Sequence, residues 1–384
     1  MSLKRELPYI DFYKKHKIAP VSQDITDLQK HFSRRRALYR SLGMLPGYFK
    51  DKALLEFGPG CGHNALFTKS LSPRKYVLVD ANPVGLAATK SLLKKYPLGS
   101  NKCEVVESLI EEYRSEDLFD VVFCENLIPY QLAPLDFLKH VASFVRPGGV
   151  LIITCQDSVS LLSEILRNLI RILVVDPEDS MEKKLEILRP IFIPHLASLK
   201  NMTRPIDDWI LDQAIQPITG DLMPIQEAIQ ALDSEFEIYG SSPEFLMDWR
   251  WYKAIPEDNK YNGIAINLAN QNIHNLLDYR FTYPPQSSEI NDKIRFLCDG
   301  IFVLMKKFEV NSDIRYLEEL NENLKSLSKI VRKYSLETAA SIEDFARAAG
   351  CYLSDKSFPE LKEFVPFFGR GTQYLSFTRT EVSA

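Results

Sequence analysis

A glycine-rich turn and a carboxylate follow two neighbouring apolar segments of this chain. Residues 54–62 read Leu-Leu-Glu-Phe-Gly-Pro-Gly-Cys-Gly, and Val-Leu-Val-Asp follows at residues 77–80. Glycine lacks a Cβ, so a turn of this kind lets the backbone approach a ligand closely. In a doubly wound α/β sheet, a carboxylate at the tip of the second strand can accept hydrogen bonds from both hydroxyls of a ribose. The spacing therefore predicts a nucleoside-binding site in which Asp80 holds the ribose.

The details of the turn favour one kind of nucleoside ligand. Glu56 stands two residues before the first glycine, and His63 occupies the position where a dinucleotide-binding turn has its third glycine. Both details point away from NAD and toward S-adenosylmethionine. Three further pieces follow in order, Glu107-Ser108, Glu125-Asn126 and Arg146-Pro-Gly-Gly149. With these pieces, residues 53–155 resemble the class I S-adenosylmethionine-dependent methyltransferases.

The resemblance implies S-adenosylmethionine as cofactor, S-adenosylhomocysteine as product and a set of cofactor-binding residues. Glu56 would hold the ammonium group, directly or through water, and the backbone of 58–62 would pass under the methionine part. Asn82 would reach the adenosine edge, and Glu107 or Ser108 would lie near the adenine. The full expected set is Glu56, Gly58, Pro59, Gly60, Gly62, Asp80, Ala81, Asn82, Glu107, Ser108, Glu125 and Asn126.

Three residues are candidates for a catalytic role, although positioning alone can supply much of the rate of methyl transfer. Glu125 would orient a hydroxyl or amine, or act as a general base. Tyr130 would line the pocket or pack as part of a lid. His63 titrates near neutrality, but a helix N-terminus disfavours the imidazolium, so a cofactor-orienting role competes with base catalysis. Methyltransferases that act on amino groups of DNA or RNA bases have a motif similar to Asn126-Leu-Ile-Pro-Tyr130. Here Leu-Ile interrupts the motif, which argues against a nucleic-acid base as the substrate.

Regular alternation of strands and helices predicts the fold of the first half of the chain. Such alternation implies a parallel sheet with right-handed crossovers. We expect an α/β, Rossmann-like, doubly wound and mostly parallel sheet with N-terminal helices, a long insertion after strand five and a largely helical C-terminal cap. The expected strands are Ala53–Phe57, Tyr76–Asp80, Cys103–Val106, Asp120–Cys124 and Val150–Cys155, and the helices between them are 63–71, 83–96 and 135–144.

The expected domain organisation has four parts. They are an N-terminal helical segment (1–52), the cofactor-binding domain (53–158, its sheet completed near 235–242), an insertion or cap (159–234) and a mainly helical C-terminal region (245–384). An apolar stripe over 161–174 predicts a helix that packs on a neighbouring domain or, as the alternative, lies on a membrane surface. A further helix begins after Ser312 or Asp313, and its leucines indicate an intramolecular hairpin or a homodimer seam.

Composition limits the kinds of binding partner and the cellular compartment that we expect for this protein. The chain has 384 residues, 26% charged residues and a formal net charge of -4, which argues against broad nucleic-acid binding. Its six cysteines form no CxxC pair, so we expect no metal site. The N-terminus lacks an apolar signal core and no apolar run is long enough to span a membrane. We therefore expect a cytoplasmic protein without a transmembrane segment.

Three functions fit these observations. The first is methyl transfer to an oxygen or nitrogen of a small-molecule or glycan-type substrate, closed off by the cap. The second is RNA or protein methylation, guided by the basic N-terminal segment around Arg34-Arg35-Arg36, since residues 1–54 hold 12 Lys and Arg against 5 Asp and Glu. The third is a non-catalytic scaffold that binds S-adenosylmethionine, because fold alone does not establish catalysis.

Overall fold

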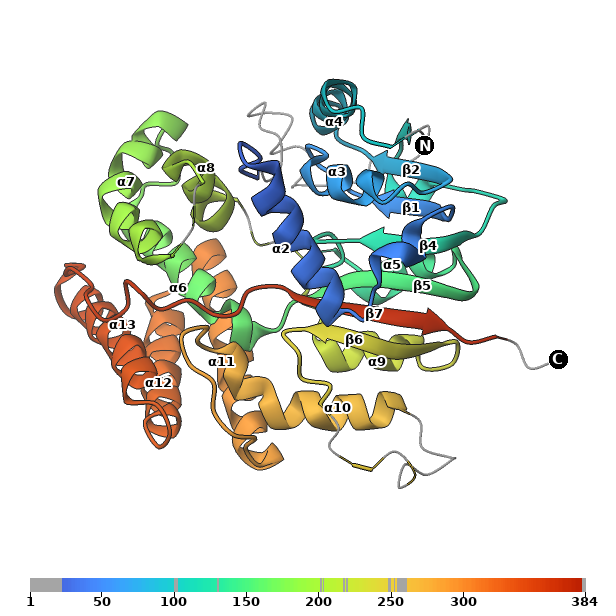
Figure 1. The fold of residues 1–384 in the computed structure, drawn as a ribbon. Coiled ribbons are helices and arrows are strands. Elements are labelled where there is room, and N and C mark those ends of the chain that lie inside the picture. Colours follow the sequence, from blue (N-terminus) through green and yellow to red (C-terminus); the bar gives the residue numbers. More distant parts are fainter. Residues whose placement is uncertain are drawn as a thin grey trace, which may run out of the picture. The chain divides into compact units, whose positions relative to one another are not determined.

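The chain divides into two compact units. The computed structural model describes residues 23–381, except 100–102, 130, 201, 203, 217, 219, 248–249, 252 and 254–260. Unit 1 takes its described residues from 1–156, 217–269 and 372–384, and unit 2 takes its own from 157–216 and 270–371 (Figure 1). The chain therefore leaves the first unit after its fifth strand and returns to it twice.

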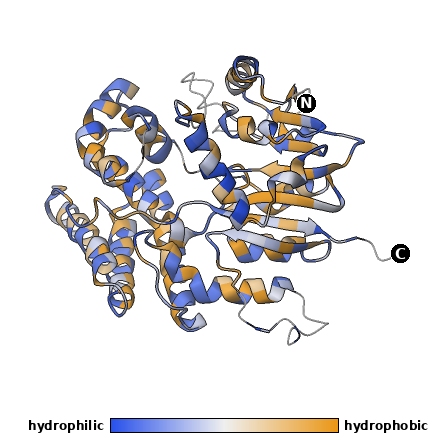
Figure 2. Ribbon diagram, in the orientation of Figure 1, coloured by the Kyte–Doolittle hydropathy of each residue, from blue (hydrophilic) through white to orange (hydrophobic). Residues whose placement is uncertain are grey.

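Unit 1 is built on a seven-stranded sheet with the order β3-β2-β1-β4-β5-β7-β6. The strands from β3 to β5 in this order pair in parallel, whereas β7 pairs antiparallel with both β5 and β6. Figure 2 shows the central strands as largely hydrophobic, as expected for a sheet covered on both faces. The strands are β1 (Ala53–Phe57), β2 (Lys75–Asp80), β3 (Cys103–Glu107), β4 (Phe119–Cys124), β5 (Val145–Cys155), β6 (Phe236–Ser242) and β7 (Gln373–Arg379).

Alternation along each strand divides the core of unit 1 between the two faces of the sheet. Leu54 packs in one hydrophobic cluster with Tyr39 and Phe67, whereas Leu55 and Phe57 pack in the other. Because side chains alternate with a period of two, Glu56 shares the face of Leu54. The helices of this unit are α2 (Leu28–Ser41), α3 (His63–Ser70), α4 (Pro83–Lys95), α5 (Pro134–Ala142), α9 (Ile225–Leu232) and the greater part of α10 (Tyr261–Asn272).

The sheet differs from the sequence-based expectation at two places. Strand β5 begins at Val145 and includes Arg146-Pro-Gly-Gly149, whereas we expected the strand to begin after these residues, at Val150. Its pairing with β4 shifts register between Phe119 and Val121, so an irregularity absorbs the extra residues. Strand β7 was not expected at all, because residues 373–379 lie beyond a long helical region. Its seven residues fill the place between β5 and β6.

Unit 2 is helical in the described residues. Helix α6 packs against α11, which in turn packs against α12, and α12 packs against α13. The apolar stripe of α6 is buried, which corrects the membrane-surface alternative. The leucines of α12 are buried within the same unit, so its stripe is an intramolecular seam. The helices are α6 (Ser158–Val174), α7 (Met181–Ser198), α8 (Ile206–Ile210), η3 (Leu211–Ile215), η5 (Ile273–Leu276), α11 (Ser288–Asn311), α12 (Ile314–Val331) and α13 (Leu336–Asp355).

Helix termini in this unit follow the capping residues of the sequence. Asp313 caps α12 by accepting the Arg315 N–H, which confirms one of the two expected caps. Asp157 caps α6 in the same manner. Within the part of the chain that the structure describes, no helix is both long and apolar enough to cross a membrane.

Candidate functional site

The glycine turn after β1 is held in a conformation that favours glycine. Gly58, Gly60 and Gly62 have φ values of 68°, 56° and 77°, in the left-handed region where a Cβ is strained. The Gly58 N–H donates to the Val79 carbonyl at 2.8 Å, and the Gly62 N–H donates to the Pro59 carbonyl at 2.9 Å. Gly62 also caps α3, so the turn leads directly into a helix N-terminus, which attracts negative charge.

Asp80 ties this turn to the loop after β2. Its carboxylate accepts the Gly60 N–H at 3.3 Å and the Asn82 N–H at 2.8 Å. Burial raises the pKa of Asp80, and the backbone N–H groups oppose that effect. The Asn82 Oδ1 accepts the Val84 N–H at 3.0 Å and so caps α4. Asp80 thus lies at the tip of β2, beside the turn, as the sequence predicts.

Glu56 is buried on the face of the sheet that α2 covers. Its carboxylate accepts a hydrogen bond from the Tyr76 hydroxyl on the neighbouring strand β2. Burial, followed in size by repulsion from Glu125, raises the pKa of Glu56 to about 7. A carboxyl group in this environment is a favourable place for a ligand cation, because the cation would stabilise the carboxylate that burial destabilises.

Glu125 follows β4 and forms a bidentate ion pair with Arg35 of α2. The Arg35 guanidinium donates to both carboxylate oxygens, with N–O distances of 2.6 and 2.9 Å. The two side chains are only 8% and 11% exposed. Figure 1 shows α2 crossing the sheet face near the ends of β1 and β4. Arg35 is therefore part of the interior, which corrects the expectation that it belongs to an RNA-guiding surface.

A chain of hydrogen bonds connects the two carboxylates through side chains of α2, α3 and β2. Arg35 also donates to the Tyr39 hydroxyl at 3.2 Å, which lies 3.1 Å from the Thr68 hydroxyl. Thr68 in turn hydrogen bonds to Tyr76, which donates to Glu56. A polar network of this kind fixes the positions of its members, because every buried group depends on its neighbours.

His63 is engaged by the N-terminal segment. Its Nδ1 accepts the Gln23 N–H at 2.9 Å, and its carbonyl oxygen lies 3.0 Å from the His31 Nε2. Burial, with a smaller contribution from His31, lowers the pKa of His63. The accepting Nδ1 requires the tautomer that carries its proton on Nε2. With its Nδ1 lone pair occupied, His63 has no free ring nitrogen to act as a base in this tautomer, and its cofactor-orienting role stays a prediction.

The other expected site residues lie at the same edge of the sheet. Glu107 is exposed at the end of β3, opposite Asp80 in the strand register. The Ser108 N–H donates to the Asp80 carbonyl at 3.1 Å, and Ala81 is half-buried in the same loop. Asn126 adopts a φ of 59°, and its N–H donates to the Thr154 hydroxyl at 2.7 Å. Tyr130 lies outside the described residues.

The polar residues that surround the two carboxylates are not among the site residues predicted from the sequence. Arg35, Tyr39, Tyr76 and Tyr374 all lie on the buried side of their elements. One signal was present, since His31, Arg35 and Tyr39 recur every four residues and so share one face of a helix. A cation on that face, between two buried residues, indicates an internal partner rather than solvent.

Two further groups of polar side chains serve the structure of unit 2. Arg370 donates to the Asn275 and Phe281 carbonyls, at 2.6 and 2.7 Å, so its guanidinium is occupied within the protein. His195 and His274 are buried in the helical core. Among the described residues, no group of His, Cys, Asp and Glu has the arrangement of a metal site.

The residues present fit S-adenosylmethionine in three respects. The Nδ2 of Asn82 is buried and has no partner within the described part of the chain, so a ligand acceptor beside it would satisfy this donor. Glu56 is a buried carboxyl whose hydrogen-bond donor is a neutral phenol, so it can receive the ammonium group. Asp80 keeps lone pairs for ribose hydroxyls, because each of its oxygens has capacity for two hydrogen bonds.

Comparisons with known proteins agree with this geometry. Residues 30–193 match the family model described as a methyltransferase domain. The chain is 35% identical over 100 residues to demethylluteothin O-methyltransferase of Streptomyces thioluteus, which is 25% of this chain and 43% of that protein. It is 27% identical over 120 residues to the mitochondrial ubiquinone biosynthesis O-methyltransferase of Schizosaccharomyces pombe, which is 31% of this chain and 42% of that one. The chain thus spans less than half the length of either relative.

A structure of PKMT2 from Rickettsia typhi in complex with AdoHcy is also similar. It has a TM-score of 0.40 and 16% sequence identity, and the match covers 61% of this chain and 49% of that chain. The family match coincides with the glycine turn, Asp80 and the paired carboxylates of unit 1. Residues 30–193 of this chain therefore resemble a methyltransferase domain of the class I S-adenosylmethionine-dependent type.

Proposed function

We propose that this protein transfers a methyl group from S-adenosylmethionine to an oxygen or nitrogen of a small-molecule or glycan-type substrate. One observation carries the proposal: a glycine turn, a ribose-type carboxylate and a buried carboxyl meet at the carboxyl ends of β1, β2 and β4. Ligands of open α/β sheets bind at this edge. The names of the two O-methyltransferases that resemble this chain support oxygen as the acceptor.

The side chains of unit 1 would bind and orient rather than form covalent bonds. When bound, S-adenosylmethionine supplies a methyl group on a sulfonium, which leaves as a neutral thioether. Asp80 would hold the ribose, Glu56 the ammonium group, and the 58–62 backbone the methionine part. Glu125 remains our candidate for orienting the acceptor or accepting its proton, although its ion pair with Arg35 favours orientation. Much of the rate would then come from alignment.

The RNA or protein alternative is less well supported. Arg35, the centre of the basic run 34–36, is buried in unit 1, so two of the three arginines of that run, Arg34 and Arg36, are exposed to an anionic partner. The scaffold alternative predicts cofactor binding without turnover. Incubation with S-adenosylmethionine and fractionated metabolite, glycan, RNA and protein pools, followed by measurement of S-adenosylhomocysteine, separates the three functions. Cofactor binding with no product from any pool would contradict the proposal.

Asp80→Ala should weaken binding of S-adenosylhomocysteine by more than about 1 kcal/mol, because it removes the charged acceptor of the hydrogen bonds that the ribose hydroxyls donate. Calorimetric titration of wild type and variant measures the difference. Asp80→Asn is the matched variant, since it keeps the side-chain volume and one accepting oxygen. A variant with unchanged affinity and an unchanged unfolding midpoint would exclude Asp80 as the ribose ligand.

A further inference from the structure

Two carboxyl groups and a single guanidinium occupy the buried polar network behind the glycine turn. The Arg35 guanidinium forms its ion pair with Glu125, to which it donates two hydrogen bonds. Among the described residues, the hydrogen-bond donor of Glu56 is the Tyr76 hydroxyl, which is neutral. Glu56 is 8% exposed and therefore gains little from solvent. The network consequently holds one more potential negative charge than it has cations.

Within the described part of the chain, no second cation is found to act on Glu56. Arg35 is the one cation that acts on Glu56 among the described residues, and Lys69 of α3 acts on the neighbouring Cys103. The titratable and charged groups that interact with Glu56 in the described chain are Arg35 and Tyr39 of α2, Tyr76 of β2, Cys103 of β3, Cys124 of β4 and Glu125 after it. A buried carboxyl in such surroundings is more stable when it is neutral.

We propose that Glu56 holds a proton in the ligand-free protein, and that the ammonium group of the cofactor displaces this proton on binding. This inference rests on the proposed function, because it needs S-adenosylmethionine in this site. It adds that cofactor binding is coupled to proton release. The bound ammonium would be the second cation of the network. It would pair with Glu56, and Arg35 would remain paired with Glu125.

The direction of the resulting pH dependence follows from the protonation of Glu56. Burial and the nearby Glu125 raise the pKa of Glu56 to about 7. Below that pH the carboxyl is neutral and the ligand must first remove a proton, so affinity falls as the pH falls. From pH 7 to pH 5.5 the expected weakening is roughly tenfold. An α-amino group stays largely protonated over this range, so the ligand's own charge changes little.

The test compares two ligands that share the adenosine. S-Adenosylhomocysteine carries the ammonium group, whereas 5′-methylthioadenosine lacks the whole amino-acid part. Calorimetric titration at pH 5.5 and 7 should show roughly tenfold weaker binding of S-adenosylhomocysteine at the lower pH, and nearly constant binding of 5′-methylthioadenosine. Titration near pH 6.5 in two buffers of different ionisation enthalpy should show release of up to one proton for the first ligand only.

Glu56→Gln supplies the matched variant, since glutamine keeps an acceptor for Tyr76 and cannot ionise. Its affinity for S-adenosylhomocysteine should be lower at pH 7 but nearly equal at both pH values. Equal pH dependence for the two ligands, or for wild type and Glu56→Gln, would overturn the inference while leaving the proposed function intact. Failure of wild type to bind S-adenosylhomocysteine at either pH would instead contradict the proposed function, and the inference with it.

Discussion

Arg35→Met should destabilise unit 1 by about 3–5 kcal/mol, the scale for removing one partner of a buried ion pair. The variant leaves Glu125 buried without its guanidinium and removes a cation that acts on Glu56. Methionine fills much of the same volume, so the loss reports charge and hydrogen bonds more than packing. Chemical denaturation measures the change in free energy, and S-adenosylhomocysteine binding should fall with it because Glu125 loses its fixed position.

Two variants test the explanation for Arg35. Arg34→Met changes the preceding residue of the same helix, which is exposed, and should alter the free energy of unfolding little. Arg35→Met combined with Glu125→Gln removes both charges and should recover a substantial part of the stability that Arg35→Met loses. Equal stabilities of Arg34→Met and Arg35→Met would show that the buried ion pair is not important for this unit.

The sequence predicts the cofactor half of the fold because local patterns and tertiary context agree there. Apolar strands, glycine turns and helix caps all indicate the same elements, and β1 has the bounds that the pattern predicts. Strand β7 escaped prediction because its pairing with β5 joins residues far apart along the chain. No local pattern reports such a partner, and a seven-residue segment with three apolar residues after a helical region has several possible structures.

The candidate site shows the same division between local and distant information. Asp80 and the glycine turn lie within 30 residues of each other, and their spacing carries the prediction. The ion pair of Glu125 joins two residues 90 positions apart, so the sequence alone does not reveal it. The ion pair with Arg35 changes the role we expect for Glu125. A carboxylate held by two N–H donors is better suited to orient a substrate than to accept its proton. The pairing of charged residues in the interior of unit 1 is thus the feature of the site that could not be predicted from the sequence.

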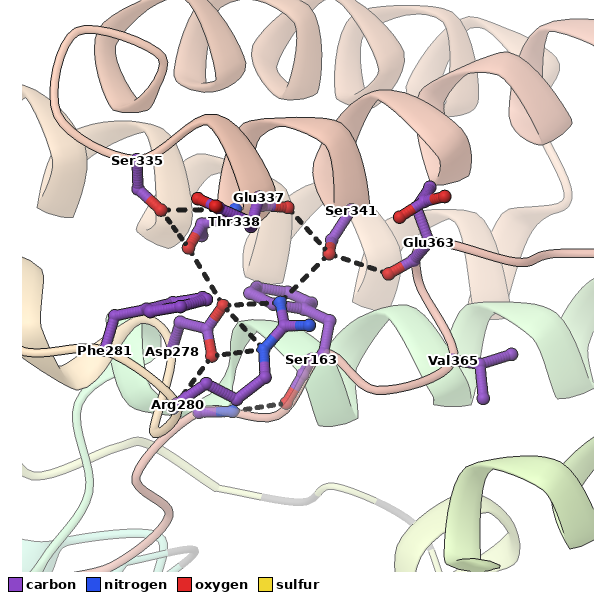
Figure 3. A network of polar contacts seen from close by, with 12 residues as sticks. Ser163, Asp278, Arg280, Phe281, Ser335, Glu337, Thr338, Ser341, Glu363 and Val365 are labelled. Carbon is purple, nitrogen blue, oxygen red and sulfur yellow. Dashed lines mark hydrogen bonds and ion pairs between the residues drawn. The ribbon is translucent and has the colours of Figure 1, made fainter. Parts of the chain in front are cut away.

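Arg280→Ala should destabilise unit 2 by about 2–3 kcal/mol, somewhat below the scale for a fully buried pair because Arg280 is partly exposed. Its guanidinium donates to Asp278, with the shortest N–O distance 2.7 Å, and to the Ser341 hydroxyl at 3.1 Å (Figure 3). Asp278 is 4% exposed and also accepts the Thr338 hydroxyl at 2.9 Å. The variant therefore leaves a buried carboxylate with two donors, the Thr338 hydroxyl and its own loop's backbone N–H.

The chain offers a matched control for this variant in a second Asp-x-Arg sequence. Arg315 makes the same bidentate contact with Asp313, and its backbone N–H donates to that carboxylate as well. This arginine side chain is 82% exposed, so solvent can replace it when it is removed. Arg315→Ala should therefore leave the denaturation midpoint almost unchanged. Since the two pairs share one local geometry, a similar loss in both variants would mean that the geometry of the pair, rather than burial of Asp278, determines its contribution. A large loss for Arg280→Ala alone would assign the stabilisation to the buried carboxylate and its contacts with α13.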